Sequence, residues 1–107
     1  MPARETFDYL WAKVEPMSSA VEGMLGRNVV LDLKNSFVYV GKLAEIGGEF
    51  FVLADADAHD LRDTPTMTRE QYVVRCREHG IEVNRARIAV VRAEVTAICL
   101  LDDVVPN

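Results

Sequence analysis

The sequence predicts a mainly β fold with some helix, in which five strongly bent antiparallel strands form a small open barrel. Short segments alternate apolar and polar residues, as half-buried strands do. A glycine interrupts one of these segments at a point where a strand would bend sharply. The chain has 107 residues, half of them hydrophobic, which is enough to bury the core of one domain over residues 1–107.

The N-terminal region, residues 4–25, is predicted to be helical. Its first part has one apolar stripe at helical spacing, made of Phe7, Leu10, Trp11 and Val14. Pro16 ends or kinks this helix, and Ser19 with Glu22 forms a capping box for a second helical piece. The sequence leaves open whether the two pieces are continuous.

Residues 27–56 are predicted to form the first three strands. Val29, Leu31 and Leu33 alternate with polar neighbours, and Asn35 with Ser36 marks the first turn. The second strand contains the interior glycine, Gly41, and a Gly-Gly pair at 47 and 48 makes the next tight turn. The segment "EFFVLADA" then reads as the third strand.

Residues 57–85 are predicted to form an inserted arm with a helix at 68–79. Thr68 and Gln71 form a capping box at its start, and Gly80 ends it. Residues 86–102 hold the last two strands, 86–92 and 95–101, with a very short hairpin turn around Ala93 and Glu94.

The last two strands carry apolar side chains on both faces, more than a monomer of this size covers. An open barrel also leaves strand edges that need protection or a partner chain. We therefore expect self-association through these strands, with an oligomer interface at Ile88, Val90, Val95, Ile98 and Leu100.

Composition argues against several classes of protein. No run of 18 or more apolar residues could span a membrane, and the charged N-terminal segment lacks the apolar core of a signal peptide. We expect a cytoplasmic protein without a cofactor. Cys76 and Cys99 lack metal-binding or redox spacing and are interpreted as small buried hydrophobic residues. No catalytic constellation is present, so no enzyme activity is predicted.

The stretch "DADAHD", residues 55–60, allows two interpretations. Asp55, Asp57 and His59 alternate, so an extended strand would point all three side chains to one side as a possible metal site. Alternatively, Asp55 ends the third strand, and Asp57, His59 and Asp60 lie in a solvated loop. We favour the loop and predict no metal.

Arginines are concentrated in residues 62–92, which hold seven of them against four acids in a chain of net charge −5. The basic arm predicted from them comprises Arg69, Arg75, Arg77, Arg85 and Arg87. Such an arm is able to contact an RNA backbone or an acidic protein. The alternative is an ordinary solvated helix face, on which these arginines pair with Asp60, Asp63, Glu70, Glu78 and Glu82.

In two segments the chain resembles the Sm-like (LSm) domain family. "VVLDLKNSFVYVGKL" followed by "FFVLADA" resembles the first Sm motif, with Lys34, Asn35, Tyr39 and Gly41 at characteristic places. "VVRAEVTAI" resembles the second motif around Arg92. The resemblance covers residues 18–56 and 86–102. It implies a bent five-stranded sheet and a closed ring, a hexamer or heptamer, in which the fourth strand of one subunit pairs with the fifth of the next.

The resemblance also implies RNA binding, but the sequence departs from the family's uridine pocket. That pocket uses an aromatic residue or His and an Asn from the turn before the third strand, and an Arg from the turn before the fifth. Here the first turn is "EIGGEFFVL", without Asn and with an added acid, Glu49. Arg92 is present at the second turn, although Ala93 replaces the family's Gly. The candidate RNA-binding residues are Arg92, Phe50, Gly48 and Asn35.

Three functions follow from these observations. The first is a ring-forming protein that binds single-stranded RNA or serves RNA metabolism. The second is a ring that has lost the uridine pocket and acts as a scaffold for protein partners. The third and least favoured is a small metal-dependent enzyme at Asp55, Asp57 and His59. Because fold does not fix function, the first rests mainly on the resemblance.

Overall fold

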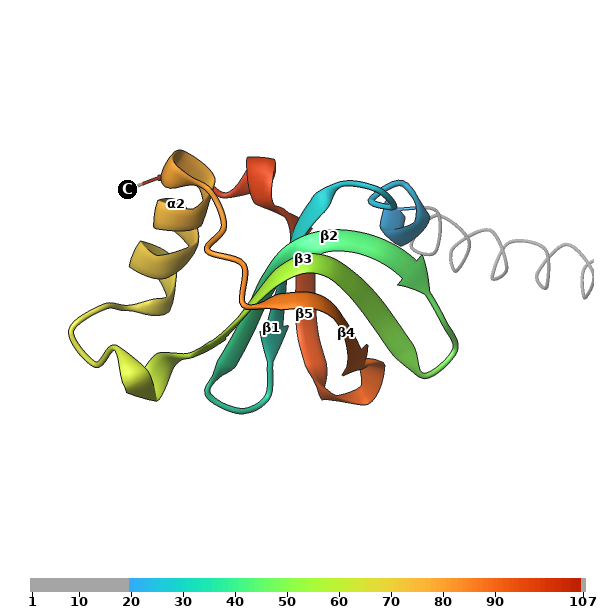
Figure 1. Ribbon diagram of the computed structural model, residues 1–107, viewed down its shortest axis with the longest axis horizontal. Helices are drawn as coiled ribbons and strands as arrows, with labels where there is room; N and C mark the ends of the chain where they lie inside the picture. The colour runs from blue at the N-terminus through green and yellow to red at the C-terminus, as the bar shows by residue number, and fades with distance from the viewer. Residues whose placement is uncertain (1–19, 107) are drawn as a thin grey trace, which may run out of the picture.

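The computed structural model describes residues 20–106, which form a bent antiparallel sheet of five strands with one helix packed beside it (Figure 1). The strands are β1 (Asn28–Leu33), β2 (Phe37–Ile46), β3 (Phe50–Asp60), β4 (Arg85–Val91) and β5 (Val95–Leu100). Helix α2 (Arg69–His79) lies between β3 and β4. The predicted fold class is therefore confirmed. The predicted N-terminal helix lies outside the described residues, except that 20–22 are helical.

The strand order in the sheet is β4-β3-β2-β1-β5, which leaves β4 and β5 at the two edges. The short 3-10 turn η2 (Arg92–Glu94) connects them. The predicted hairpin between these strands is wrong, because β4 pairs with β3 whereas β5 pairs with β1. The bend of the sheet brings its two edges close enough for three residues to cross from one to the other.

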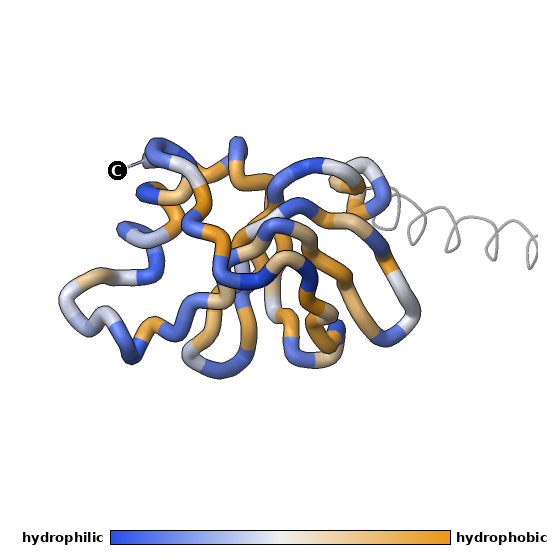
Figure 2. The backbone as a smooth tube through the Cα atoms, in the orientation of Figure 1, coloured by the Kyte–Doolittle hydropathy of each residue, from blue (hydrophilic) through white to orange (hydrophobic). Residues whose placement is uncertain are grey.

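The sheet buries apolar side chains on both faces. Inside the barrel, Leu31, Leu43 and Leu53 are fully buried in one cluster. On the outer face, Val38 and Val40 pack with Tyr72 of α2 in a second cluster. Figure 2 shows hydrophobic residues along the strands and hydrophilic ones in the turn between β1 and β2. Helix α2 thus gives the outer face of β2 its own hydrophobic core.

A β-bulge bends the sheet at Gly41. The strand register passes from Val40 opposite Asp57 to Lys42 opposite Ala54, so two residues of β3 face Gly41 alone. One of them, Asp55, has a φ of 48°, which aspartate tolerates better than most residues. A side chain on Gly41 would meet Ala56, since a Cβ there would lie 2.7 Å from the Ala56 Cβ. The bend that the sequence predicted at Gly41 is present.

The predicted loop at residues 57–60 is instead the last part of β3, which runs to Asp60. Asp57 is only 7% exposed there, opposite Val40 of β2. The bulge at Asp55 changes the alternation, so Asp55 is exposed while Asp57 points to the outer-face core. Backbone pairing with β2 keeps this polar stretch in the sheet.

Helix α2 begins with the capping box predicted from Thr68 and Gln71. The Thr68 hydroxyl accepts a hydrogen bond from the Gln71 backbone N–H at 3.1 Å, and the Gln71 side chain accepts one from the Thr68 N–H at 2.8 Å. The Gly80 N–H donates to the Cys76 carbonyl at the other end. Across the described residues, no helix is long and apolar enough to cross a membrane.

Replacing Thr68 with alanine is expected to lower the free energy of unfolding by about 1 kcal/mol, because the first turn of α2 loses its cap. Urea denaturation followed by circular dichroism measures this. Thr66→Ala, at an exposed position in the preceding turn, is the matched control and should change stability by less than about 0.5 kcal/mol. Equal effects of the two variants would contradict a capping role for Thr68.

Candidate nucleic-acid interface

Three turns meet at one end of the barrel, along the lower side of Figure 1. The backbone N–H of Arg92 in η2 donates to the Glu49 carbonyl in the β2–β3 turn at 2.9 Å. The Lys34 N–H, at the end of β1, donates to the Glu94 carbonyl at 2.9 Å. The turn η2 is therefore held between the β1–β2 turn and the β2–β3 turn, and its side chains have fixed surroundings.

The Arg92 guanidinium is anchored by two contacts at this end. Its carbon lies 4.8 Å from the centroid of the Phe51 ring, within cation–π distance. Its Nη1 donates a hydrogen bond to the Gly47 carbonyl at 2.6 Å. Arg92 and Phe51 also line an open hollow of about 220 Å³ that continues along residues 95–98 of β5. The arrangement presents a positioned cation beside an accessible concave surface.

Phe50 and Phe51 have opposite orientations, because successive strand residues point to opposite faces. Phe51 is 5% exposed and belongs to the barrel core, whereas Phe50 is 43% exposed. Phe50 lies opposite Val91 of β4, which is also exposed, so the two form an apolar pair on the face away from the Arg92 guanidinium. The structure thus brings Phe50 and Arg92 to the same end of the sheet but to different faces.

Gly48 lies at the tip of the β2–β3 turn, next to the glycine whose carbonyl holds Arg92. A Cβ built on Gly48 would have nothing within 4 Å, so this tip is open to solvent or to a ligand. Glu49 in this turn is exposed, and Glu94 of η2 is exposed as well. Two carboxylates near Arg92 disfavour a phosphate here and leave room for a neutral group.

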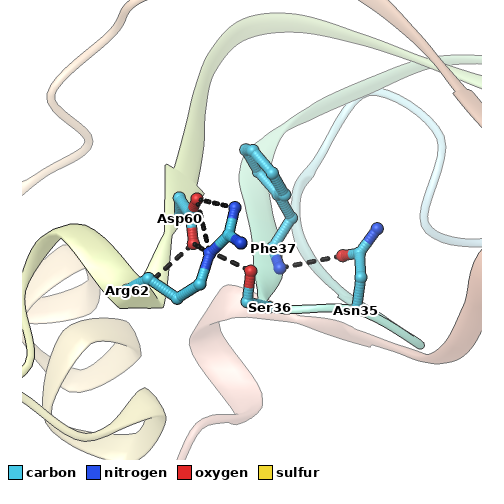
Figure 3. Close-up of polar contacts among 5 residues, drawn as sticks. All are labelled: Asn35, Ser36, Phe37, Asp60 and Arg62. Carbon is cyan, nitrogen blue, oxygen red and sulfur yellow. Dashed lines mark hydrogen bonds and ion pairs between the residues drawn. The ribbon is translucent and has the colours of Figure 1, made fainter.

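Asn35 braces the β1–β2 turn rather than contacting Arg92. Its side-chain carbonyl accepts a hydrogen bond from the Phe37 N–H at 2.8 Å (Figure 3). The next residue, Ser36, donates through its hydroxyl to Asp60 at 2.8 Å. Arg62 donates to both carboxylate oxygens of Asp60, and these hydrogen bonds hold the pKa of that carboxyl well below its usual range. The turn is therefore tied to the end of β3.

Asp57, from the "DADAHD" stretch, accepts two hydrogen bonds at the outer-face core. The Tyr72 hydroxyl donates to one carboxylate oxygen at 2.5 Å, and the Asn84 side-chain amide donates to the other at 2.9 Å. His59 stacks on the Tyr72 ring with centroids 4.0 Å apart. Burial, with the hydrogen bond to Asp57, raises the pKa of the Tyr72 phenol, so the hydroxyl remains a donor. Sequence reasoning missed Tyr72 and Asn84 as partners because no local spacing links them to Asp57.

This arrangement uses the acids and His59 as structural groups. Within residues 20–106, no set of three or more His, Cys, Asp or Glu side chains is placed to hold a metal ion. Both cysteines are free thiols, and burial raises the pKa of each, which keeps them protonated and less reactive.

The arginines of the predicted arm do not share one environment. Arg69 pairs with Asp32 of β1 at 2.8 Å, and Arg87 pairs with Glu45 of β2. Arg75 lies 5.8 Å over the Tyr72 ring. Arg85 donates to the backbone carbonyl of Asn84, and Arg77 lines a separate hollow near the C-terminal end of α2. Tertiary contacts with β1 and β2 therefore neutralise part of the arm.

Comparison with known proteins identifies a fold. No family model matches the chain, and no curated protein matches it in sequence. A solved structure, the Sm protein of Pyrococcus abyssii in complex with a uridine heptamer, matches with a TM-score of 0.53 and 20% sequence identity. The match covers 77% of this chain and 93% of that one. Together with the five-stranded bent sheet, this similarity shows that the chain has the Sm fold.

Proposed function

We propose that this chain forms an Sm-like ring and binds single-stranded RNA at the end of the barrel where Arg92 lies. The observation that carries this proposal is the anchoring of the Arg92 guanidinium by Phe51 and the Gly47 carbonyl beside an open hollow. The similar fold of a protein in complex with a uridine heptamer supports the choice of ligand.

The chemistry at Arg92 suits a nucleobase better than a phosphate. A guanidinium plane stacks on bases, and its remaining N–H groups donate hydrogen bonds to base carbonyls. The nearby carboxylates of Glu49 and Glu94 would repel a phosphate, so the RNA backbone would lie farther out. Gly48 leaves the turn open for close approach, and Phe50 and Asn35 are proposed as peripheral contacts.

The free edges of the sheet support ring formation. Strands β4 and β5 each have one unpaired side within residues 20–106. Pairing β4 of one copy with β5 of the next would satisfy both and cover Ile88, Val95 and Ile98, which are only partly buried. We propose a closed homo-oligomer of six or seven copies, each a single Sm-like domain. The proposed interface includes Val90 and Leu100 as well.

The alternative is a ring that serves as a scaffold for protein partners. The exposed carboxylates of Glu49 and Glu94 favour it, because they oppose RNA at the end of the barrel where the Arg92 guanidinium is positioned. The ion pairs of Arg69 and Arg87 also favour the scaffold, because they neutralise part of the basic arm. Arg75, Arg77 and Arg85 are left for contacts to RNA or protein. Under either function we propose a cytoplasmic protein that is not an enzyme and uses no cofactor.

Replacing Arg92 with alanine is expected to weaken the binding of short U-rich RNA roughly fivefold to 150-fold, because one stacked base contributes about 1–3 kcal/mol. Fluorescence anisotropy with U-rich, A-rich and mixed RNAs at two salt concentrations measures this. Arg77→Ala removes an equal charge away from the three turns and is the matched control.

The oligomer mass should be determined in the same buffer. Binding of wild-type protein that survives moderate salt and is lost only in Arg92→Ala would support the RNA function. An intact ring that binds none of the RNAs would favour the protein scaffold. Equal losses in Arg92→Ala and Arg77→Ala would mean that charge alone, and not the anchored guanidinium, determines binding.

A further inference from the structure

The two free edges of the sheet carry opposite charge at the ends that would meet. Strand β4 begins with Arg85 and Arg87 and contains no acid. Strand β5 contains no charge, but it runs directly into the short turn η3 (Leu101–Asp103), which supplies Asp102 and Asp103. Because the strands of an antiparallel pair run in opposite directions, the start of β4 in one copy would lie beside the end of β5 in the next.

A hollow of about 180 Å³ lies at this end of β5. Its apolar walls are formed by Val30 of β1, Val73 of α2, Cys99 of β5 and the tail residues Val104 and Val105. Glu70 of α2 lines it too, as do Asp32 and Arg69, which pair with each other at 2.8 Å. Val105 is 78% exposed, the highest exposure among the large hydrophobic residues described. Figure 1 shows η3 beside α2. Because Arg69 and Asp32 neutralise each other, the carboxylate of Glu70 is the unpaired charge among the lining residues, in a largely apolar hollow next to the free edge.

Glu70 and Asp103 both lie near β5, the strand at this edge of the sheet. Burial is the main cause that raises the pKa of the Cys99 thiol, and the negative charges of Asp32, Asp103 and Glu70 add to it in that order. Neither Glu70 nor Asp103 has an ion-pair partner among residues 20–106. On the opposite edge, Arg85 has no carboxylate partner in the described chain, and its guanidinium donates only to a backbone carbonyl.

The register of such a pair follows from the faces of the strands. Ile88 and Ile98 both pack on the barrel core, so they must point to the same side when the sheet continues from one copy to the next. Pairing the two strands over their full lengths places Ile88 opposite Ile98 and Arg87 opposite Cys99. Arg87 then points to the outer face, at the mouth of the hollow lined by Glu70.

We propose that α2 and η3 of each copy form an acidic corner, Glu70 with Asp103, that receives Arg85 and Arg87 from the next copy. The inference rests on the proposed ring and adds that the helix between β3 and β4 takes part in the subunit interface. Arg87 would leave its contact with Glu45, an exposed pair on the surface. That exchange costs little, because an ion pair exposed to solvent contributes little to stability.

The test uses charge reversal in the full chain. The variant R85E/R87E makes both edges acidic, and E70K/D103K makes both basic. Each variant alone is expected to raise the dissociation constant of the oligomer at least tenfold. An equimolar mixture is expected to assemble into rings that contain both chains, in equal number if the ring has six copies and in a four-to-three ratio if it has seven. Native mass spectrometry measures both results. D63K, which reverses an exposed charge in the 3-10 turn η1 (Leu61–Asp63) that follows β3, should assemble as the wild type does.

The outcomes separate this inference from the proposed ring. If the wild type and both variants assemble equally well, the acidic corner is wrong while the ring stands. If the variants fail and their mixture does not recover, the charges act within each copy, and the corner is again wrong. A wild-type protein that is monomeric at all concentrations would contradict the proposed ring itself. If circular dichroism shows that a charge-reversal variant is unfolded, the neutral variant R85Q/R87Q or E70Q/D103N is tested in its place.

Discussion

Replacing Asp57 with alanine is expected to lower the free energy of unfolding by about 3 kcal/mol, because the buried Tyr72 hydroxyl and the Asn84 amide lose their carboxylate acceptor. The Tyr72 hydroxyl at 2.5 Å and the Asn84 amide at 2.9 Å both donate to this carboxylate. The Asn84 side chain also accepts from the Ala58 N–H at 2.9 Å, so its displacement would loosen the end of β3 as well. Urea denaturation at neutral pH measures the loss.

The matched control is Asp55→Asn, two residues earlier on the same strand. Asp55 is exposed, and asparagine tolerates its positive φ, so the change should be within about 0.5 kcal/mol. Tyr72→Phe removes only the hydroxyl and should cost less than Asp57→Ala. In a double-mutant cycle the two changes should be strongly non-additive. If Asp57→Ala is as stable as Asp55→Asn, the buried network does not hold α2.

Replacing Gly41 with valine is expected to lower the free energy of unfolding by about 3 kcal/mol, since the new side chain overpacks the contact between β2 and the bulge of β3. Even a Cβ atom would lie 2.7 Å from the Ala56 Cβ and 2.9 Å from the Ala56 Cα, and backbone cannot move aside as a flexible side chain can. Relief of this overlap requires β3 to shift at its bulge. Urea denaturation should show a lower midpoint.

Gly48→Val is the control for this variant. Gly48 has open space around its Cα, so the same side chain should change stability by about 0.5 kcal/mol or less. A Gly41→Val protein as stable as Gly48→Val would mean that the bulge at Asp55 and Ala56 adapts freely. The sharp bend would then not depend on the glycine.

Sequence patterns predicted the strands well because each depends on local alternation and turn residues. The alternating segment at Val29–Leu33 and the Gly-Gly turn both lie where they were expected. The capping box at Thr68 also predicted the start of α2 to within one residue. Where the prediction failed, at 57–60 and at the turn 92–94, the outcome depended on which strands pair, and neither position carries a local signal for that.

The candidate site was predictable only in part. Arg92 was found from its place in the second motif, but its anchor, Phe51, depends on which of two adjacent aromatic residues enters the core. The bulges shift strand alternation by one residue, so counting along β3 from Asp55 gives the wrong face for Asp57. The pairing of Arg69 with Asp32 joins residues 37 positions apart and has no counterpart in local sequence.

Local periodicity and turn chemistry were thus sufficient for the elements and, with two short motifs, for the Sm fold. Only tertiary structure decided that Phe50 is exposed and that Asp57 is a buried acceptor. It also decided that the arginines of β4 and the acids that follow β5 lie at opposite edges of the sheet. The physical reason is that strand and turn propensities act over a few residues, whereas burial, ion pairing and edge placement depend on contacts between residues far apart in the chain.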